Sequence, residues 1–256
     1  MTHTPDPQLF ERAINILVVG CGGNGSAIAA CLPYLHQALL AFGHPGGLNV
    51  TLIDPDTVSE TNCVRQPFCR TEIGLSKAVV LAHRTNMFWG LSWQGMQLKI
   101  EHLKSGSQVD ILIGCVDTRV ARRAIDRWTL RSRVLYWLDL GNNASIGQFV
   151  IGQPNNFANR KKKDRLLAVA ELYPEIVSRK RNEDDQPSWS AAEALTRQEP
   201  FINQNLASQA LAMLTQLLRR GSLSYQGGFC NLATGQLVPL PISRSRLMPL
   251  AVEDRR

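Results

Sequence analysis

Residues 54–77 read DPDTVSETNCVRQPFCRTEIGLSK, and the rest of the chain can be understood from them. Asp54 ends an apolar run, and the polar segment after it holds Asn62, Arg65 and Gln66 close together. Ribose hydroxyls require a carboxylate acceptor, whereas phosphates favour amide donors, an Arg fork and a Lys point charge such as Lys77. The segment therefore suits a nucleoside triphosphate, although a polar surface loop after a buried strand is the alternative.

The residues directly upstream predict the nucleotide-binding half of a doubly wound sheet. Residues 14–19 form a near-continuous apolar run, typical of a strand buried on both faces. GCGGNG follows at 20–25, then a helix pattern over 27–40 in which Pro33 should produce a kink or a change of packing partner. A second strand at 49–53 ends at Asp54. Glycines in this order let the backbone approach phosphates at a helix N-terminus, the alternative being a turn that only packs closely.

Further strands and helices are predicted downstream. We expect a helix at 77–89 with Lys77 facing solvent in its first turn, an edge strand at 98–100, and buried strands at 109–116 and 134–140. Residues 149–151 are expected to start an antiparallel strand. Asp117 would lie at the carboxyl end of a strand, where ligands bind in such sheets. Six arginines, at 119, 122, 123, 127, 131 and 133, are interpreted mainly as the solvated face of a surface helix.

The C-terminal half changes in character. Residues 153–200 are expected to form a long, mobile connection over the surface, and helices are expected at 191–194 and 201–218. Basic runs at 160–163 and 179–181 lack interleaved aromatics, so a nucleic-acid partner is not favoured. A terminal hairpin is expected from strands at 229–232 and 237–240. The fold class is α/β, with a mainly parallel sheet, helices on both faces and one domain over 1–256.

The composition sets broad limits on the class of protein. The chain has 256 residues, enough to bury a large core, and its net charge of +7 favours acidic or phosphorylated partners without choosing among them. Six cysteines contain no C-x-x-C pair, which argues against a zinc knuckle. Residues 1–10 are polar and no apolar run reaches 18 residues, so we expect neither a signal peptide nor a membrane span. Free thiols in a reducing cytoplasm are the expectation.

Several motifs together resemble one family. GCGGNG, DPDTVSETNCVRQ, GLSK and CVDTRVARRA are similar to the pattern of ThiF/MoeB and ubiquitin-activating adenylyltransferases. HPGGLNVTLIDPDTVSETN, LDLGNNASIGQFVIG and PSWSAAEAL resemble more narrowly the ThiF-family protein of the PRTRC cassette of bacterial mobile elements. The resemblance extends over about residues 14–240. The N-x-x-R-Q and G-x-x-K pairing is specific, because a plain dehydrogenase has no need for it.

The resemblance implies an activity and a set of residue roles. Such enzymes bind ATP and magnesium, join AMP to the C-terminal glycine carboxylate of a ubiquitin-like β-grasp protein, and release pyrophosphate. A homodimer and a conjugating-enzyme-like partner are also implied. Asp54, with Asp56 beside it, would bind the ribose side; Gly20, Gly22, Gly23 and Gly25 would line the phosphate and adenosine side; Asn62, Arg65, Gln66 and Lys77 would hold the phosphates; Asp117 would hold magnesium. Arg65, Lys77 and Asp117 would be the catalytic residues.

The chain also departs from the family pattern. Relatives supply an arginine from the partner subunit, but only Arg12 precedes the first strand here. Residues 142–229 contain no cysteine, and Trp189 stands where we expect one, so the reaction should stop at the acyl adenylate. Cys63 and Cys69 are interpreted as packing residues. The alternatives are a NAD-dependent oxidoreductase using the same glycine loop, and a nucleotide-binding scaffold without turnover.

Overall fold

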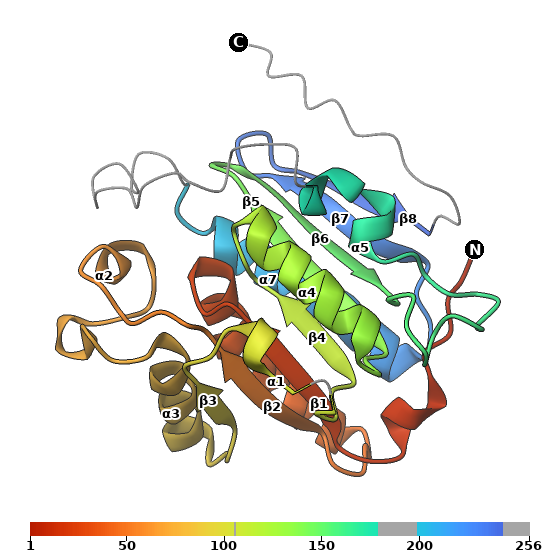
Figure 1. Ribbon diagram of the computed structural model, residues 1–256, viewed down its shortest axis with the longest axis horizontal. Helices are drawn as coiled ribbons and strands as arrows, with labels where there is room; N and C mark the ends of the chain where they lie inside the picture. Colours follow the sequence, from red (N-terminus) through yellow and green to blue (C-terminus); the bar gives the residue numbers. More distant parts are fainter. Residues whose placement is uncertain (105, 179–198, 243–256) are drawn as a thin grey trace.

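The computed structural model describes residues 1–104, 106–178 and 199–242 (Figure 1). Its strands are β1 Ile14–Val19, β2 Leu48–Ile53, β3 Gln94–Met96, β4 Ile111–Gly114, β5 Tyr136–Asn142, β6 Ile146–Gly152, β7 Tyr225–Asn231 and β8 Gln236–Pro241. They form one sheet in the order β3-β2-β1-β4-β5-β6-β7-β8. The pairs from β3 to β5 are parallel, and those from β5 to β8 are antiparallel.

Helices cover both faces of the sheet. The longer helices are α1 Gly23–Ala41, α3 Lys77–Trp89, α4 Arg119–Arg131 and α7 Ile202–Arg220; the short ones are η1 Pro7–Phe10, α2 Asn62–Arg65, η2 Arg70–Glu72, η3 Ile100–His102, α5 Val169–Leu172 and η4 Pro174–Val177. The apolar side chains of α1, α3 and α7 share one core with one face of the sheet, and those of α4 and α5 share a second core with the other. Figure 1 shows α4 in front of the sheet and α7 behind it.

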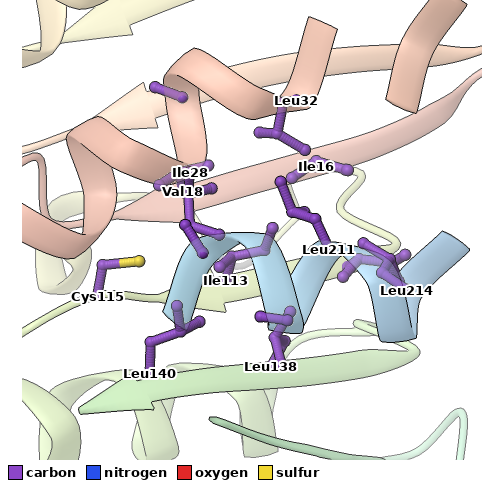
Figure 2. Close-up of a cluster of buried hydrophobic side chains, with 14 of the residues drawn as sticks. Ile16, Val18, Ile28, Leu32, Ile113, Cys115, Leu138, Leu140, Leu211 and Leu214 are labelled. Carbon is purple, nitrogen blue, oxygen red and sulfur yellow. The ribbon is translucent and has the colours of Figure 1, made fainter. Parts of the chain in front are cut away.

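The two cores follow from the alternation of side chains along buried strands. In β1, Ile16 and Val18 belong to the first core, whereas Leu17 and Val19 belong to the second. In Figure 2, Ile16 and Ile113 come from neighbouring strands and lie between the sheet and the helices α1 and α7. A strand that is apolar on both faces can be stable only between two helical layers, which explains the continuous apolar run at 14–19.

The structure confirms most of the predicted elements. The fold class is as expected, the helix predicted at 77–89 has those bounds, and the terminal hairpin is present as β7 and β8. The helix predicted at 201–218 is α7, which ends at Gly221 in the left-handed conformation, φ 65°. Pro33 lies inside α1, which continues to Ala41. The helix expected at 191–194 lies outside the described residues.

Two predicted strands and one arginine of the α4 helix differ from expectation. The edge strand is β3 at 94–96 and not 98–100, because Ile100 is buried from a 3₁₀ turn and not from a strand. The strand expected over 109–116 is shorter, Ile111–Gly114, although the N–H groups of Asp110 and Cys115 on either side of it still donate to carbonyls of β1. Among the six arginines interpreted mainly as a solvated helix face, Arg122 is an exception: its side chain is 11% exposed and pairs with the fully buried Asp139.

The segment after β6 packs closely where it is described. Leu166, Val169 and Leu172 are buried, so residues 153–178 do not simply pass over the surface. Residues 179–198, the rest of the expected connection, lie outside the described part of the chain. All six cysteines are free thiols. Within the described ranges, no helix has both the length and the apolar character that crossing a bilayer requires.

Candidate active site

A cavity of about 1560 Å³ opens at the carboxyl ends of β1, β2, β4 and β5. Parallel strands place the loops that follow them at one edge of the sheet, which is where ligands bind in folds of this type. The sequence-predicted residues that line it are Gly20, Gly22, Gly23, Asp54, Asp56, Asn62, Arg65, Gln66, Lys77 and Asp117. Gly25 is the one predicted residue outside this lining. Side chains from distant parts of the described chain thus meet around a single space.

Asp54 is held firmly at the end of β2. Its carboxylate accepts hydrogen bonds from the backbone N–H of Cys21, at 2.5 Å, and from that of Asp56, at 2.8 Å. The residue is only 5% exposed, and burial raises the pKa of its carboxyl group, an effect that these two hydrogen bonds and nearby Lys77 oppose. Each oxygen retains a further lone pair, so the carboxylate can accept from a hydroxyl in the cavity.

The glycines of the loop have different physical roles. Gly20 has φ +91°, a conformation that favours glycine, and a Cβ there would lie 2.9 Å from the Cys115 carbonyl oxygen. A Cβ at Gly25 would lie 1.8 Å from the Gly20 oxygen, so Gly25 lets α1 pack against the loop and does not itself face the cavity. A Cβ at Gly22 would meet only Gln66, at 3.9 Å. The N-cap residue of α1 is Gly22, and no described side chain caps the helix there, which leaves its first N–H groups for an anion.

The side chain of Lys77 is buried, although we expected it to face solvent. Its side chain is 9% exposed, and Nζ lies 3.1 Å from Oδ2 of Asp56, whose own side chain is 65% exposed. The expectation that a first-turn lysine faces solvent was wrong, because the segment before α3 folds back over it: the Lys77 N–H donates to the Asp56 carbonyl. An ammonium held between the protein interior and the cavity has lost much of its hydration, which strengthens its attraction for an anionic ligand.

The polar side chains between Asp54 and Lys77 have hydrogen-bonding groups available for a ligand. Asn62 is buried, and its side-chain oxygen accepts from both the N–H and the hydroxyl of Ser59, each at 2.9 Å. The amide N–H₂ group therefore remains to donate. Arg65 is exposed in the last turn of α2 and lines the cavity. The side-chain oxygen of Gln66 is buried and has no hydrogen-bond partner among the described residues, which is costly unless a ligand or water completes it.

Asp117 is exposed and lines the cavity two residues before the start of α4. The helix cap is Thr118, whose hydroxyl accepts from the Ala121 N–H at 3.2 Å. Asp117 is therefore not the N-cap residue and its carboxylate is not required there. Within the described ranges, no three His, Cys, Asp or Glu side chains gather as a metal site. Magnesium often binds through one or two carboxylates plus substrate phosphates, so a lone Asp117 fits that ion.

Arg122 and Asp139 form a buried pair that sequence reasoning missed. Nε of Arg122 lies 3.2 Å from Oδ2 of Asp139, and its NH2 group donates to the Leu140 carbonyl at 3.3 Å. Burial raises the pKa of Asp139 to about 6, although Arg122 opposes the shift. The sequence signal for this pair was Asp139 inside the apolar run YWLDL, since a charged residue on a core strand requires a partner.

A second group of missed residues lines the side of the cavity facing β5 and β6. We call it the amide wall: Asn24, Asn142, Asn143, Gln148 and Asn203. Nδ2 of Asn24 donates to Oδ1 of Asn142 at 2.9 Å, whereas Oδ1 of Asn24 is buried and has no partner in the part of the chain that the structure describes. Asn203 of α7 lies so close to Gly23 that a Cβ there would be 2.5 Å from its Nδ2. We call the opposite side, formed by the polar side chains of 54–77, the acid–lysine wall.

The thiol of Cys115 is not activated, and the other two cysteines near the cavity differ in burial. Cys115 lines it, but burial raises the pKa of its thiol well above the ordinary value, with Asp139 adding to the shift. Cys63 is half-buried and packs against the core, as expected, but Cys69 is exposed and the packing interpretation of it was wrong. Arg12 is occupied elsewhere: its guanidinium bonds both oxygens of Asp110 at 2.7 Å, before the start of β4.

Comparison with known proteins gives the family. The ThiF family model matches residues 6–159, more than half of the sequence, and the chain therefore belongs to the ThiF family. No curated protein matches the sequence.

Solved structures show the same fold. E. coli MccB has a TM-score of 0.62 at 19% identity, covering 91% of this chain and 63% of its own. E. coli MccB with ATP has a TM-score of 0.59 at 17% identity, with coverages of 92% and 65%. PaaA has a TM-score of 0.57 at 13% identity, with coverages of 90% and 64%. The chain thus spans less than two thirds of the length of these proteins, and the likeness is one of fold.

Proposed function

We propose that the protein is an ATP-dependent adenylyltransferase that activates the C-terminal glycine carboxylate of a ubiquitin-like β-grasp protein. The observation that carries the proposal is that Asp54, Asn62, Arg65, Lys77 and Asp117 line one cavity at the carboxyl ends of the parallel strands. A carboxylate for ribose, several phosphate donors and a carboxylate for a metal are the groups that a magnesium nucleotide requires. Membership of the ThiF family and the fold shared with E. coli MccB, a structure of which contains ATP, support it.

The mechanism we propose is electrostatic. The partner's carboxylate oxygen attacks the α-phosphorus, the bond to the bridging oxygen breaks, and pyrophosphate leaves. Two anions must approach each other, and Arg65 and Lys77 would offset their repulsion and stabilise the charge on the leaving group. When bound, magnesium would supply further positive charge, and Asp117 is the residue that would hold it. A protein base is unnecessary, because the attacking carboxylate is already ionised at pH 7.

The amide wall suits a different part of the reaction. Neutral amides both donate and accept, which matches a peptide backbone better than a triphosphate. We therefore assign the amide wall to the tail of the protein partner. A structure of E. coli MccB holds AMPCPP together with MccA, which is compatible with a nucleotide and a second molecule in one site of this fold.

Three finer features belong to the same proposal. The quoted sequence stretches favour the PRTRC-cassette branch of the family, in a bacterial homodimer. Because Arg12 is paired with Asp110 in its own chain, we do not assign it as the arginine that relatives supply across a dimer. The raised pKa of the Cys115 thiol supports a reaction that ends at the acyl adenylate, with any thiol acceptor on a conjugating-enzyme-like partner.

Calorimetry with two nucleotides tests the proposal directly. We expect ATP to bind in the presence of magnesium and NAD to bind much more weakly, because Arg65 and Lys77 have no role with a dinucleotide. Pyrophosphate release should then require a small protein ending in glycine. Tight NAD binding without ATP binding would favour an oxidoreductase, and ATP binding without turnover on any such protein would favour a scaffold.

A further inference from the structure

The loop between β6 and α5 presents an exposed aromatic ring between two cations. Phe157 is 64% exposed, and the guanidinium carbons of Arg133 and Arg160 lie 5.4 Å and 5.1 Å from its ring centroid. Arg133 follows α4, so the cluster joins two segments that are distant in sequence. A large ring left in water beside two guanidinium planes offers flat surfaces on which another planar group can stack.

This loop is held in place by buried amides. Asn156 and Asn159 are 2% and 0% exposed. Nδ2 of Asn156 donates to the Thr129 and Val134 carbonyls at 3.1 Å and 2.8 Å, and Nδ2 of Asn159 donates to the Val134 carbonyl at 3.0 Å. The loop is therefore anchored on both sides of Phe157, and the ring is presented by a fixed scaffold.

The cations around the ring are not consumed by internal ion pairs. In the run 160–163, only Lys162 turns inward, to Asp6 at 2.5 Å and to Asn159. Arg160, Lys161 and Lys163 are exposed, as is Arg133, and none of the four forms an ion pair with an acid in the described part of the chain. A chain with a net charge of +7 thus has a local cluster of cations facing solvent.

The cluster is separate from the cavity. Its anchors reach the carbonyls at the start of β5, whereas the cavity lies at the other end of that strand. In Figure 1 the loop before α5 lies on the right, beside the N-terminus, and α2 lies on the left. The proposed adenylation gives this surface no role.

We propose that Phe157, Arg133, Arg160, Lys161 and Lys163, which we call the Phe157 patch, bind single-stranded nucleic acid. A base stacks on Phe157 or on an adjoining guanidinium, and neighbouring phosphates lie against the lysines. A duplex hides the faces of its bases, so they cannot stack on Phe157. The charges of an acidic peptide would use the cations and not the ring. A single strand uses both the ring and the cations. The sequence did not favour nucleic acid because the aromatic ring precedes the basic run and Arg133 joins it only in the folded chain.

Fluorescence anisotropy with the full chain and a labelled oligothymidylate tests the patch. We expect Phe157→Ala to weaken binding roughly tenfold with an unchanged salt dependence, and Phe157→Tyr to bind like the parent protein. The double variant Lys161→Ala/Lys163→Ala should lower the slope of log K against log salt by about 1.4. Phe42→Ala is the matched control: Phe42 is 54% exposed and Arg219 lies 3.9 Å from its centroid, but only the pair Arg219 and Arg220 adjoins it, with no lysines in the run.

Several results would overturn the proposal. Absence of binding at low salt would do so, as would equal losses in Phe157→Ala and Phe42→Ala. Heparin binding that matches the oligonucleotide and is insensitive to Phe157→Ala would identify a general polyanion surface, and equal affinity for duplex DNA would exclude a preference for single strands. ATP binding, measured in parallel on each variant, should not change, so failure here and failure of the proposed adenylation are distinguishable.

Discussion

The acid–lysine wall and the amide wall face the same cavity but are held by different kinds of contact. In the acid–lysine wall most partners are near neighbours in sequence: Asn62 bonds Ser59, and Asp56 bonds both the Asp54 carboxylate and the Lys77 ammonium. In the amide wall the partners are far apart, since Asn24 of α1 bonds Asn142 at the end of β5. The acid–lysine wall is carried mainly by the segment 54–77, to which the Cys21 N–H adds one bond at Asp54, whereas the amide wall forms only when separate elements come together.

The difference has consequences for mutation. A change in the acid–lysine wall should affect ligand binding with a limited effect on folding, because the segment 54–77 satisfies most of its own polar groups. A change in the amide wall, or in the Arg122–Asp139 pair beneath it, should affect stability, because these contacts join separate elements.

Lys77→Met should have the largest effect. Methionine keeps most of the volume of this buried side chain and removes only the charge, so turnover should fall roughly 10²–10³-fold, as for loss of one preorganised electrostatic group. ATP-dependent pyrophosphate exchange measures it, and thermal unfolding should change little. Lys104→Met, at an exposed position away from the cavity, is the control. Normal exchange in Lys77→Met would remove this lysine from the site.

Asp139→Asn should change how stability depends on pH. The folded-state pKa of about 6 lies above the ordinary value of 3.8, so this carboxyl contributes stability that is fully present below about pH 3.8 and is lost as the pH rises through about 6. Relative to Asp139→Asn, the parent protein should lose on the order of 1–3 kcal/mol between pH 4 and pH 7. Urea unfolding across that range gives the measurement. Parallel pH profiles for the two proteins would show that Asp139 stays ionised throughout.

Asp117→Asn tests whether magnesium-dependent ATP binding requires a carboxylate outside the acid–lysine wall. We expect the magnesium concentration for half-maximal ATP binding to rise roughly tenfold, because fewer charged ligands lower cation affinity. Thr118 caps α4 in either case, so the stability should not change. Glu101→Gln removes another exposed carboxylate that lines the cavity and should leave the magnesium requirement unaltered. Equal effects of the two substitutions would indicate that the magnesium requirement depends on the total negative charge around the cavity and not on one carboxylate ligand.

The same division explains what could be predicted from the sequence. The hydrophobic period and the order of the glycines were enough to predict β1, β2 and α3. A strand that is apolar on both faces has few alternative positions in a fold. The lining residues from Asp54 to Lys77 could be named because they lie in one segment. Arg122 could not, since its helix looked amphipathic and its partner Asp139 lies on another element. The burial of Lys77 was missed because it depends on the preceding segment folding back, which no local pattern describes.

Asn142→Ala should have the smallest effect on nucleotide binding and divides the two walls most sharply. It removes the acceptor for Nδ2 of Asn24, whose Oδ1 already lacks a partner, so the Asn24 amide would lose the hydrogen bond that fixes it. The free energy of unfolding should fall by about 1–2 kcal/mol, the usual cost of an unsatisfied buried donor. ATP affinity should remain within about threefold, under 1 kcal/mol, because the amide wall does not hold the phosphates in our assignment.

The control is Asn143→Ala, because Asn143 is exposed and its contacts among the described residues are made by its backbone. Calorimetry and urea unfolding on the same samples separate the two effects, and an ATP loss as large as that in Lys77→Met would mean that both walls bind the nucleotide.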